Sequence, residues 1–352
     1  MHRVIPFGIV YLPILTALLG LCWGGAWTWA TFGVVFVLLP LLDLLGGQEL
    51  RNPEAGDFTP GERWAFKLVT WLITPLLVGL TLAGAWVVSH RSFASWELAG
   101  VVVSLGVASG GLGITVAHEL IHKTRAFDRF LGQVLLLNAC YMHFYVEHLI
   151  GHHSRVATPE DPASARFGES LYAFLPRTLW GSLRSVWHLE AARLGRQGLP
   201  AHHPRNRTYL YVLLPLAVAG VLTLLWGPMA GGLFLAQGVL AFLLLEIVNY
   251  VEHYGLAREA LPGGRYERVT HHHSWSCANR FSNWMTLQLQ RHADHHTHPV
   301  RPYEELRFDP ETPTLPTGYP GMIWLATVPP VWRRVMDPRV EAVRARVNAS
   351  AR

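Results

Sequence analysis

The chain of 352 residues is poor in charged residues. Only 15% of them are charged and 51% are hydrophobic, whereas soluble globular proteins carry about 25% charge. This composition excludes an ordinary soluble enzyme and a disordered chain. It also argues against a nucleic-acid-binding protein, although the net charge is +5 at pH 7 with neutral histidine.

Cysteine is scarce as well. The three copies, Cys22, Cys140 and Cys277, are far apart and form no CxxC pair, so the sequence indicates neither a disulfide framework nor a cysteine-ligated metal. A phosphate-binding loop and a dinucleotide fingerprint are also missing. We therefore do not expect NADH to bind this chain, and any redox partner should be a separate protein.

Long uncharged runs predict membrane-spanning helices. Residues 4–42 hold no charge, which is enough for two helices of about 17–20 residues with a turn near Gly24 and Gly25. Further uncharged runs cover residues 68–90, 98–117 and 208–245, the last broken near Gly227. The sequence thus predicts an all-α integral membrane protein of one domain with six transmembrane helices, spanning about residues 4–45, 66–117 and 208–252. Catalytic segments are expected outside the bilayer at about 118–207 and 253–352.

A seventh apolar stretch, residues 130–146, lies between two histidine clusters. If it crossed the bilayer, these clusters would face opposite sides, so we expect a buried or re-entrant helix. All the histidine clusters then share one face of the membrane. Eight arginines between residues 154 and 207 predict that this face is the cytoplasmic one, because cytoplasmic loops are enriched in basic residues.

Histidine is abundant, and 17 of its 19 copies lie between His118 and His298. Three clusters have helical spacing, HELIH from residue 118, EHLIGHH from 147 and HADHH from 292. Residues i and i+4 on a helix share a face and can share a metal ion. With the isolated His253 the candidates exceed the needs of one ion, so we expect two metal ions with about four nitrogen ligands each. The candidate ligands are His118, His122, His148, His152, His153, His253, His292, His295 and His296.

Other interpretations of the histidines stay open at this point. Imidazole binds Fe, Zn, Cu and Ni, so the ligands alone do not name the metal. HELIH also fits the HExxH pattern of zinc proteases, but that interpretation leaves seven other histidines without a role. A metal transporter would need histidines and carboxylates within its membrane spans, whereas the histidine clusters here are expected at one face of the membrane. The remaining isolated histidines are interpreted as surface or core residues: His2, His90, His143, His188, His202, His203 and His298.

Four sequence elements resemble the signature boxes of the bacterial alkane 1-monooxygenases. They are HELIHK from residue 118, EHLIGHH from 147, NYVEHYGL from 249 and LQRHADHH from 289. RVATPEDPAS from 155 and HSW from 273 extend the likeness, which covers about residues 116–306. NYVEHYGL is the most specific element, because histidine boxes alone also occur in membrane desaturases and xylene monooxygenases.

The resemblance implies a non-haem di-iron enzyme that uses O2 to hydroxylate the terminal methyl group of n-alkanes. It implies that the nine candidate histidines hold the two irons, and that rubredoxin, reduced by an NADH-dependent reductase, delivers the electrons. A sister oxygenase acting on methylarenes or acyl chains is the alternative. The sequence departs from the family at His271 and His272, which extend HSW into a triple histidine, and at Ser276 and Cys277.

The chemistry agrees with this resemblance, because an alkane offers no group to polarise or deprotonate and requires a metal–oxygen oxidant. Carboxylates next to the candidate ligands are expected to accept the free ring N–H groups and to fix the histidine tautomers. We expect an outer position around the metals for Glu119, Glu147, Glu252, Asp294 and His273.

The substrate should arrive from the bilayer, where alkanes partition, through a channel between helices. The basic segment from residue 154 to 207 is expected to dock an acidic electron donor, with Arg193 and Arg196 as candidates. Glycines in the channel could equally serve close helix packing. The candidate lining residues are Trp27, Trp29, Phe32, Trp71, Trp86, Gly110, Gly111 and Gly113.

Overall fold

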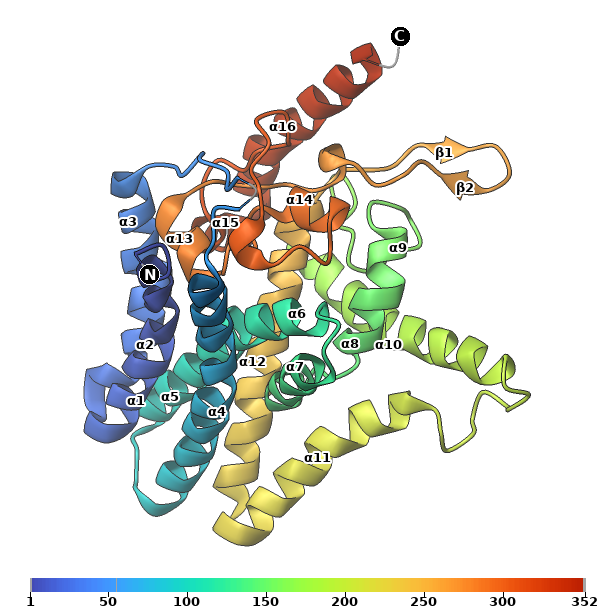
Figure 1. The fold of residues 1–352 in the computed structure, drawn as a ribbon. Coiled ribbons are helices and arrows are strands. Elements are labelled where there is room, and N and C mark those ends of the chain that lie inside the picture. The colour runs from blue at the N-terminus through green and yellow to red at the C-terminus, as the bar shows by residue number, and fades with distance from the viewer. Residues whose placement is uncertain (1, 55, 351–352) are drawn as a thin grey trace.

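The structure is a computed structural model that describes residues 2–54 and 56–350. Its longest helices form a bundle, and the histidine-bearing segments lie across one end of that bundle (Figure 1). The strands within the described ranges are the short antiparallel β1 (Ala260–Leu261) and β2 (Arg265–Tyr266), which form a projecting hairpin. The predicted all-α class is confirmed.

Six helices of the described chain are long and apolar enough to cross a membrane, which confirms the predicted number. All but the first extend past their uncharged runs, because charged residues at the ends also adopt helical conformation. The first two spans consist of η1 (Ile5–Tyr11), α1 (Leu12–Trp23), η2 (Gly25–Trp29), α2 (Ala30–Gly33), η3 (Val34–Leu38) and α3 (Leu39–Gly46). The others are α4 (Pro60–His90), a helix made of α5 (Ser95–Val107), η4 (Ala108–Ile114) and α6 (Thr115–Ile121), then α11 (Arg207–Trp226) and α12 (Pro228–His253).

The turns at the far end of the bundle are built from glycine and one arginine. Gly24 and Gly227 have φ values of 68° and 90°, a left-handed conformation that glycine adopts without steric cost. Arg91 donates to the backbone carbonyl groups of Leu21 and Cys22, which have no helical partner at the end of α1. The two predicted hairpins, near Gly24 and Gly227, are thereby confirmed.

The fourth span is the central helix of the bundle. Its most apolar window is 72% buried, against 22–44% in the other five spans. A Cβ at Gly110 would lie 2.6 Å from the Ala241 carbonyl oxygen, and one at Gly113 would lie 2.6 Å from a methyl group of Leu77. Close packing against α12 and α4 therefore requires these glycines. This central helix ends at the first histidine cluster.

The seventh apolar stretch does not form a span. It forms α7 (Ala126–Asn138), whose 13 residues are too few to cross a bilayer, and then turns back toward the histidine face. Leu135 and Leu136 are fully buried, and α7 packs against α6 and α4. The expectation that this stretch does not cross the bilayer is confirmed, but the helix starts earlier and ends sooner than predicted and is buried on one face only, with Phe130 60% exposed.

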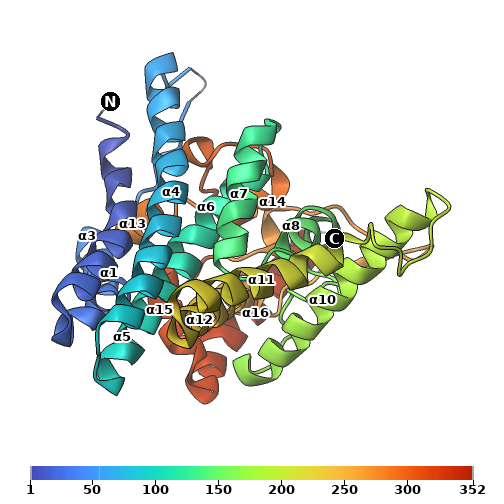
Figure 2. The same ribbon diagram turned by 90° about the horizontal axis from the view of Figure 1, so that it is seen from below.

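The histidine face is made of short helices and two long ones, α10 and α16. Figures 1 and 2 show α10 and α11 extending to one side of the bundle. Trp332, Met336 and Val340 of α16 pack in a second core with Tyr250 and Tyr254. The elements are α8 (Phe144–Val146), η5 (Glu147–His152), α9 (His153–Arg155), α10 (Leu171–Gly195), η6 (His271–His273), α13 (Arg280–Met285), α14 (His292–Thr297), η7 (Tyr303–Glu305), α15 (Tyr319–Ala326) and α16 (Pro329–Ser350).

Candidate metal centre

The nine candidate histidines come together in two adjacent groups. In each group the ligand atoms, one per side chain, all lie within 4.8 Å of one another. The rings of His153 and His296, one from each group, have centroids 4.7 Å apart. The outer group consists of His118, His122, His148, His153 and His295, and the inner group consists of His152, His253, His292 and His296.

Spacings in the outer group fit a single metal ion. The Nε2 atom of His148 lies 3.0 Å from the Nε2 atoms of both His122 and His153, and the His153 and His295 Nε2 atoms are 3.2 Å apart. Two nitrogen ligands about 2.1 Å from one ion are roughly 3 Å apart when they subtend a right angle. The buried Nε2 atom of His118 has no hydrogen-bond partner, as expected of a lone pair kept for a metal.

The inner group has the same geometry. Its successive Nε2 atoms are separated by 3.2 Å between His253 and His292, 2.9 Å between His292 and His296, and 3.3 Å between His296 and His152. All four side chains are buried, whereas His122 and His153 of the outer group are half-buried. The outer group is thus the one closer to solvent.

The protonation state of the rings also suits metal binding. Burial, and then the neighbouring imidazoles, lower the pKa of His122 and of His153 to about 2. The same causes lower the pKa of His292, His295 and His296 well below the usual value. Neutral imidazoles, each with a free lone pair, are the form in which histidine binds metal.

A π-helical segment distributes the second cluster between the two groups. In η5, each turn holds more residues than an α-helix, so i and i+5 share a face. His148 and His153 accordingly belong to the outer group, while His152 belongs to the inner group. A regular α-helix would have aligned His148 with His152 instead.

Two other features position the inner ligands. The backbone N–H of Trp275 donates to the Glu252 carbonyl at 2.8 Å, and the Trp275 indole donates to the Tyr254 carbonyl at 2.8 Å, so the HSW element holds the end of α12 beside His253. Arg291, which is 2% exposed, donates to the Leu306 carbonyl at 2.7 Å. This buried arginine anchors the start of α14.

Three of the carboxylates that were expected to support the metal ligands have other partners. Glu119 pairs with Lys123 at 2.5 Å, Glu147 with Arg155 at 2.8 Å and Asp294 with Arg301 at 2.6 Å. Sequence neighbours on a helix point about 100° apart, so a carboxylate next to a histidine faces away from its ring. This corrects the expectation that these three carboxylates accept the free ring N–H groups of the ligand histidines. Burial raises the pKa of Glu147 to about 7.

Asp161 has the role expected of those carboxylates. Its Oδ2 atom accepts from His152 Nδ1 at 2.9 Å, and Ser164 donates to the same oxygen at 2.7 Å. Burial raises the pKa of Asp161, but His152 and the hydrogen bonds outweigh burial and lower it to about 2. Sequence reasoning missed this residue, because it lies in a loop nine positions after its partner.

Glu252 and His273 have different surroundings. Glu252 accepts from the Tyr319 hydroxyl at 2.5 Å, and its other oxygen lies 3.3 Å from His292 Nε2, on the metal-facing side of that ring. His273 instead contacts Glu267 at 3.2 Å and belongs to neither group. The neighbouring His271 and His272 also lie outside both groups, as do the isolated histidines that were interpreted as ordinary residues.

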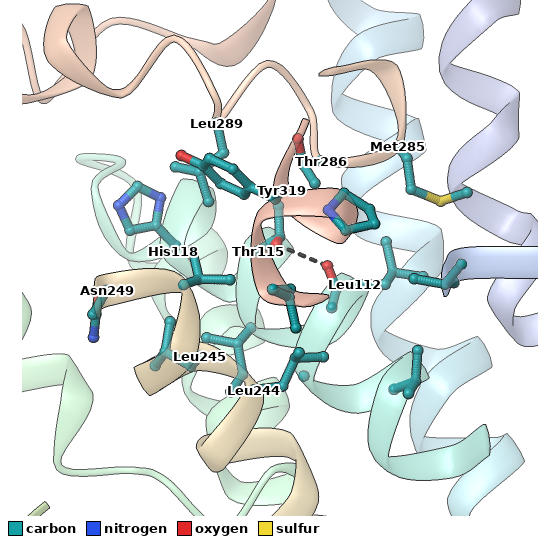
Figure 3. A pocket seen from close by; sticks show the side chains of 18 of the residues that line it. Leu112, Thr115, His118, Leu244, Leu245, Asn249, Met285, Thr286, Leu289 and Tyr319 are labelled. Atoms are coloured by element: carbon teal, nitrogen blue, oxygen red, sulfur yellow. Dashed lines mark hydrogen bonds between the residues drawn. The ribbon is translucent and has the colours of Figure 1, made fainter. Parts of the chain in front are cut away.

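An apolar cavity reaches the metal centre from within the bundle (Figure 3). His118, His148 and His292 line one end of it, so the cavity touches both histidine groups. Leucine and other aliphatic side chains form most of the wall, and Tyr319 and Asn249 supply polar groups near the histidines. Tyr319 and several other lining residues come from α13, α15 and the loops between them, which sequence reasoning had not connected with the channel.

The structure separates the predicted channel residues. Gly110 and Gly111 line the cavity, whereas Gly113 packs against Leu77. The aromatic candidates do not line it. Trp27 and Trp86 are about half exposed. The Trp29 indole donates to the Trp96 carbonyl, and the Trp71 indole donates to Asp128. Phe32 contacts Phe36, which does line the cavity.

The two predicted docking arginines differ. Arg193 pairs with the buried carboxylate of Glu190 at 2.8 Å, and Arg207 pairs with the same carboxylate at 2.6 Å. The Glu190 carboxylate thus joins α10 to α11 through Arg207, and Arg193 is occupied by the same carboxylate. Arg196 is exposed at the outer end of α10, which extends away from the histidine groups in Figure 1.

Fold and site together define a helical membrane protein with a polyhistidine metal centre, and the family model for fatty acid desaturase matches residues 94–325. Alkane 1-monooxygenase 2 of Pseudomonas aeruginosa is 44% identical over 331 residues, which cover 93% of this chain and 88% of its own. Alkane 1-monooxygenase of Pseudomonas putida is 37% identical and covers 92% of this chain and 82% of its own. The xylene/toluene monooxygenase hydroxylase component of Pseudomonas putida is 29% identical, with 91% and 85% covered. The chain belongs to the alkane 1-monooxygenase family, which confirms the resemblance inferred from the histidine boxes, and it is a membrane monooxygenase.

Proposed function

We propose that this protein hydroxylates the terminal methyl group of n-alkanes with O2, using two iron ions held by the nine histidines and electrons from reduced rubredoxin. The alkane 1-monooxygenase relatives support this reaction. The observation that carries it is the apolar cavity that ends on histidines of both groups. Iron bound there would supply the O2 activation that breaking an unactivated C–H bond requires.

The cavity wall suits a chain without functional groups. Its far side is formed by Pro13, Val35, Phe36 and Leu39 of the first two spans. The adjacent Val37 is 52% exposed on the outside of the bundle, where lipid would lie. An alkane can thus move from the bilayer into the cavity without crossing water.

The chain's own residues hold and orient the substrate. The aliphatic wall excludes water and directs one end of the chain toward His118 and His292. Glu252, hydrogen-bonded to Tyr319, is the carboxylate placed to hold or move a proton beside His292. Glu119, bound to Lys123, is not free to act as the general base of a zinc protease.

Turnover and metal content test this proposal together. The purified protein in nanodiscs would receive octane, hexadecane or xylene with O2, rubredoxin, its reductase and NADH, and iron and zinc would be counted on the same sample. We expect about two irons per chain and 1-octanol that disappears when rubredoxin is omitted. Stoichiometric zinc without alcohol would refute the proposal, and oxidation of xylene alone would move the substrate to methylarenes.

We further propose that the histidine face lies in the cytoplasm beneath the bacterial inner membrane. Residues 118–207 hold eleven Lys and Arg against seven Asp and Glu, while Arg91 is the basic residue of the short loops at the opposite face. Cys22 is exposed at the end of the first span on that opposite face. A membrane-impermeant maleimide should label Cys22 in spheroplasts, and should label Gly264→Cys in the β1–β2 hairpin, made together with Cys22→Ser, only after lysis. The reverse pattern would invert the orientation.

For the donor we propose a docking surface at the cleft beside His122. Lys67 and Arg125 line this cleft and are exposed, with no carboxylate within ion-pair distance in the described chain. His122 is also one of the two half-buried ligands, which gives a short path for electrons. Glu119 and Asp128 also line the cleft, but they bind Lys123 and the Trp71 indole, and Glu304 is half-buried. The exposed Lys67 and Arg125 would therefore attract an acidic donor.

Charge reversal tests this surface. Lys67→Glu combined with Arg125→Glu should raise the Michaelis constant for rubredoxin roughly ten-fold. The Michaelis constant for the alkane should stay unchanged. Arg196→Glu, at the outer end of α10, is the matched control and should leave the constant unchanged. If the control has the larger effect, the docking surface lies on α10.

A further inference from the structure

A second groove lies on the outer side of the junction between α10 and α11, separate from the metal centre. Trp180, Leu183 and Trp187 of α10 form one wall, and Val212 and Leu213 of α11 form the other. The proposed hydroxylation does not involve this groove.

The groove is mostly apolar, and its walls are exposed on the outside of the protein. Trp180 is 69% exposed and Leu213 is 58% exposed, although both are large apolar side chains. α11 is a candidate membrane span of which only 28% is buried within the protein, so lipid surrounds most of it. Trp187 packs edge-on against Tyr209, with ring centroids 5.7 Å apart. Such aromatic pairs are typical of the boundary between the bilayer core and the headgroups.

An uncompensated positive charge lies at the rim of this groove. Arg184 lines it and is exposed, and its Nε atom lies 3.4 Å from the ring of His188. Within the described chain no carboxylate lies within ion-pair distance of Arg184. Other arginines of the same segment are paired in this way: Arg155, Arg177, Arg193 and Arg207.

We propose that this groove binds one anionic phospholipid from the histidine-side leaflet. Its phosphate group would lie at Arg184 and His188, and one acyl chain would lie between Trp180 and Leu213. The charge selects an anionic over a zwitterionic headgroup, because a guanidinium forms charge-assisted hydrogen bonds with phosphate oxygens. The lipid fills the groove between α10 and α11.

Native mass spectrometry of the full-length protein, titrated with phosphatidylglycerol or phosphatidylcholine, tests the site. We expect one tightly retained phosphatidylglycerol and weaker retention of phosphatidylcholine. Arg184→Gln should raise the apparent dissociation constant for phosphatidylglycerol roughly ten-fold, the scale of one charge-assisted hydrogen bond, and leave that for phosphatidylcholine unchanged. Arg196→Gln, exposed beyond the groove at the end of the same helix, should stay within about two-fold of wild type.

Two results would overturn the proposal. One is equal affinity of Arg184→Gln and Arg196→Gln for phosphatidylglycerol, and the other is equal affinity of the wild type for both lipids. Arg184→Lys keeps the charge and should keep most of the affinity, which separates loss of the headgroup contact from misfolding. Metal content and alkane turnover are measured independently, so failure of this lipid site leaves the proposed hydroxylation unaffected.

Discussion

The outer and inner histidine groups differ in both exposure and support. The outer group has five members, and His122 and His153 are half-buried. The inner group has four buried members, and the carboxylates of Asp161 and Glu252 lie within 3.3 Å of two of their ring nitrogens. For the outer rings the described chain contains no carboxylate within ion-pair distance. The comparison indicates one histidine group that is partly exposed and a second that is buried and contacted by carboxylates, while the apolar cavity touches both.

The largest expected effect is the loss of one inner ligand. His296→Ala leaves three histidines in the inner group, and we expect about one iron per chain and less than about 1% of wild-type turnover, a larger loss than the 10–100-fold typical of outer-shell changes. His122→Ala leaves four ligands in the outer group and should keep more iron and more activity. Equal losses in the two variants, by metal analysis and octanol formation, would remove the distinction between the groups.

The second-largest effect is expected from Asp161, the carboxylate that contacts an inner ligand. Asp161→Asn should reduce turnover or iron affinity about 10–100-fold, because the amide no longer fixes the tautomer of His152 as a carboxylate does. Glu119→Gln is the control, since Glu119 follows a ligand in the sequence but contacts Lys123. Iron titration and turnover compare the two variants, and a larger effect of Glu119→Gln would contradict the assignment of Asp161.

A smaller effect is expected at the far end of the cavity that both groups share. Phe36→Ala should lengthen the space available to the chain and raise the ratio of hexadecane to octane turnover roughly ten-fold. Phe32→Ala removes the ring that contacts Phe36 outside the lining and should change this ratio little. An unchanged ratio in Phe36→Ala, measured by competition between the two alkanes, would place the substrate elsewhere.

The smallest effect is expected at the opposite end of the bundle. Trp27 is 52% exposed and packs against Trp23, with ring centroids 4.9 Å apart. It precedes Val35, the nearest cavity residue of that span, by eight positions. Trp27→Ala should therefore change kcat/KM for octane less than about two-fold. A loss of kcat/KM for octane of roughly ten-fold in Trp27→Ala would instead place Trp27 on the substrate path.

Much of the fold could be predicted because local features of the sequence determine it. Uncharged runs specify the spans, and Gly24 and Gly227 mark the turns between them. Helical spacing of histidines was enough to propose eight of the nine ligands that the structure brings together, and His253 was proposed as an isolated histidine at the end of the last predicted span.

The division of the ligands into groups could not be predicted, because it depends on contacts between clusters. His153 meets His295 across 142 positions, and the π-helical turn of η5 separates His148 from His152. Asp161 approaches its ring from a loop, where no periodicity indicates direction. The cavity likewise combines the fourth span with α15, which lies beyond a proline-rich segment, so hydropathy indicates the helices but not their shared wall.

X-ray anomalous scattering at the iron edge from crystals of the purified protein tests the central claim most directly. The account predicts two iron peaks, one among His118, His122, His148, His153 and His295, and one among His152, His253, His292 and His296. A single peak between the groups, or peaks that appear at the zinc edge and not at the iron edge, would contradict it.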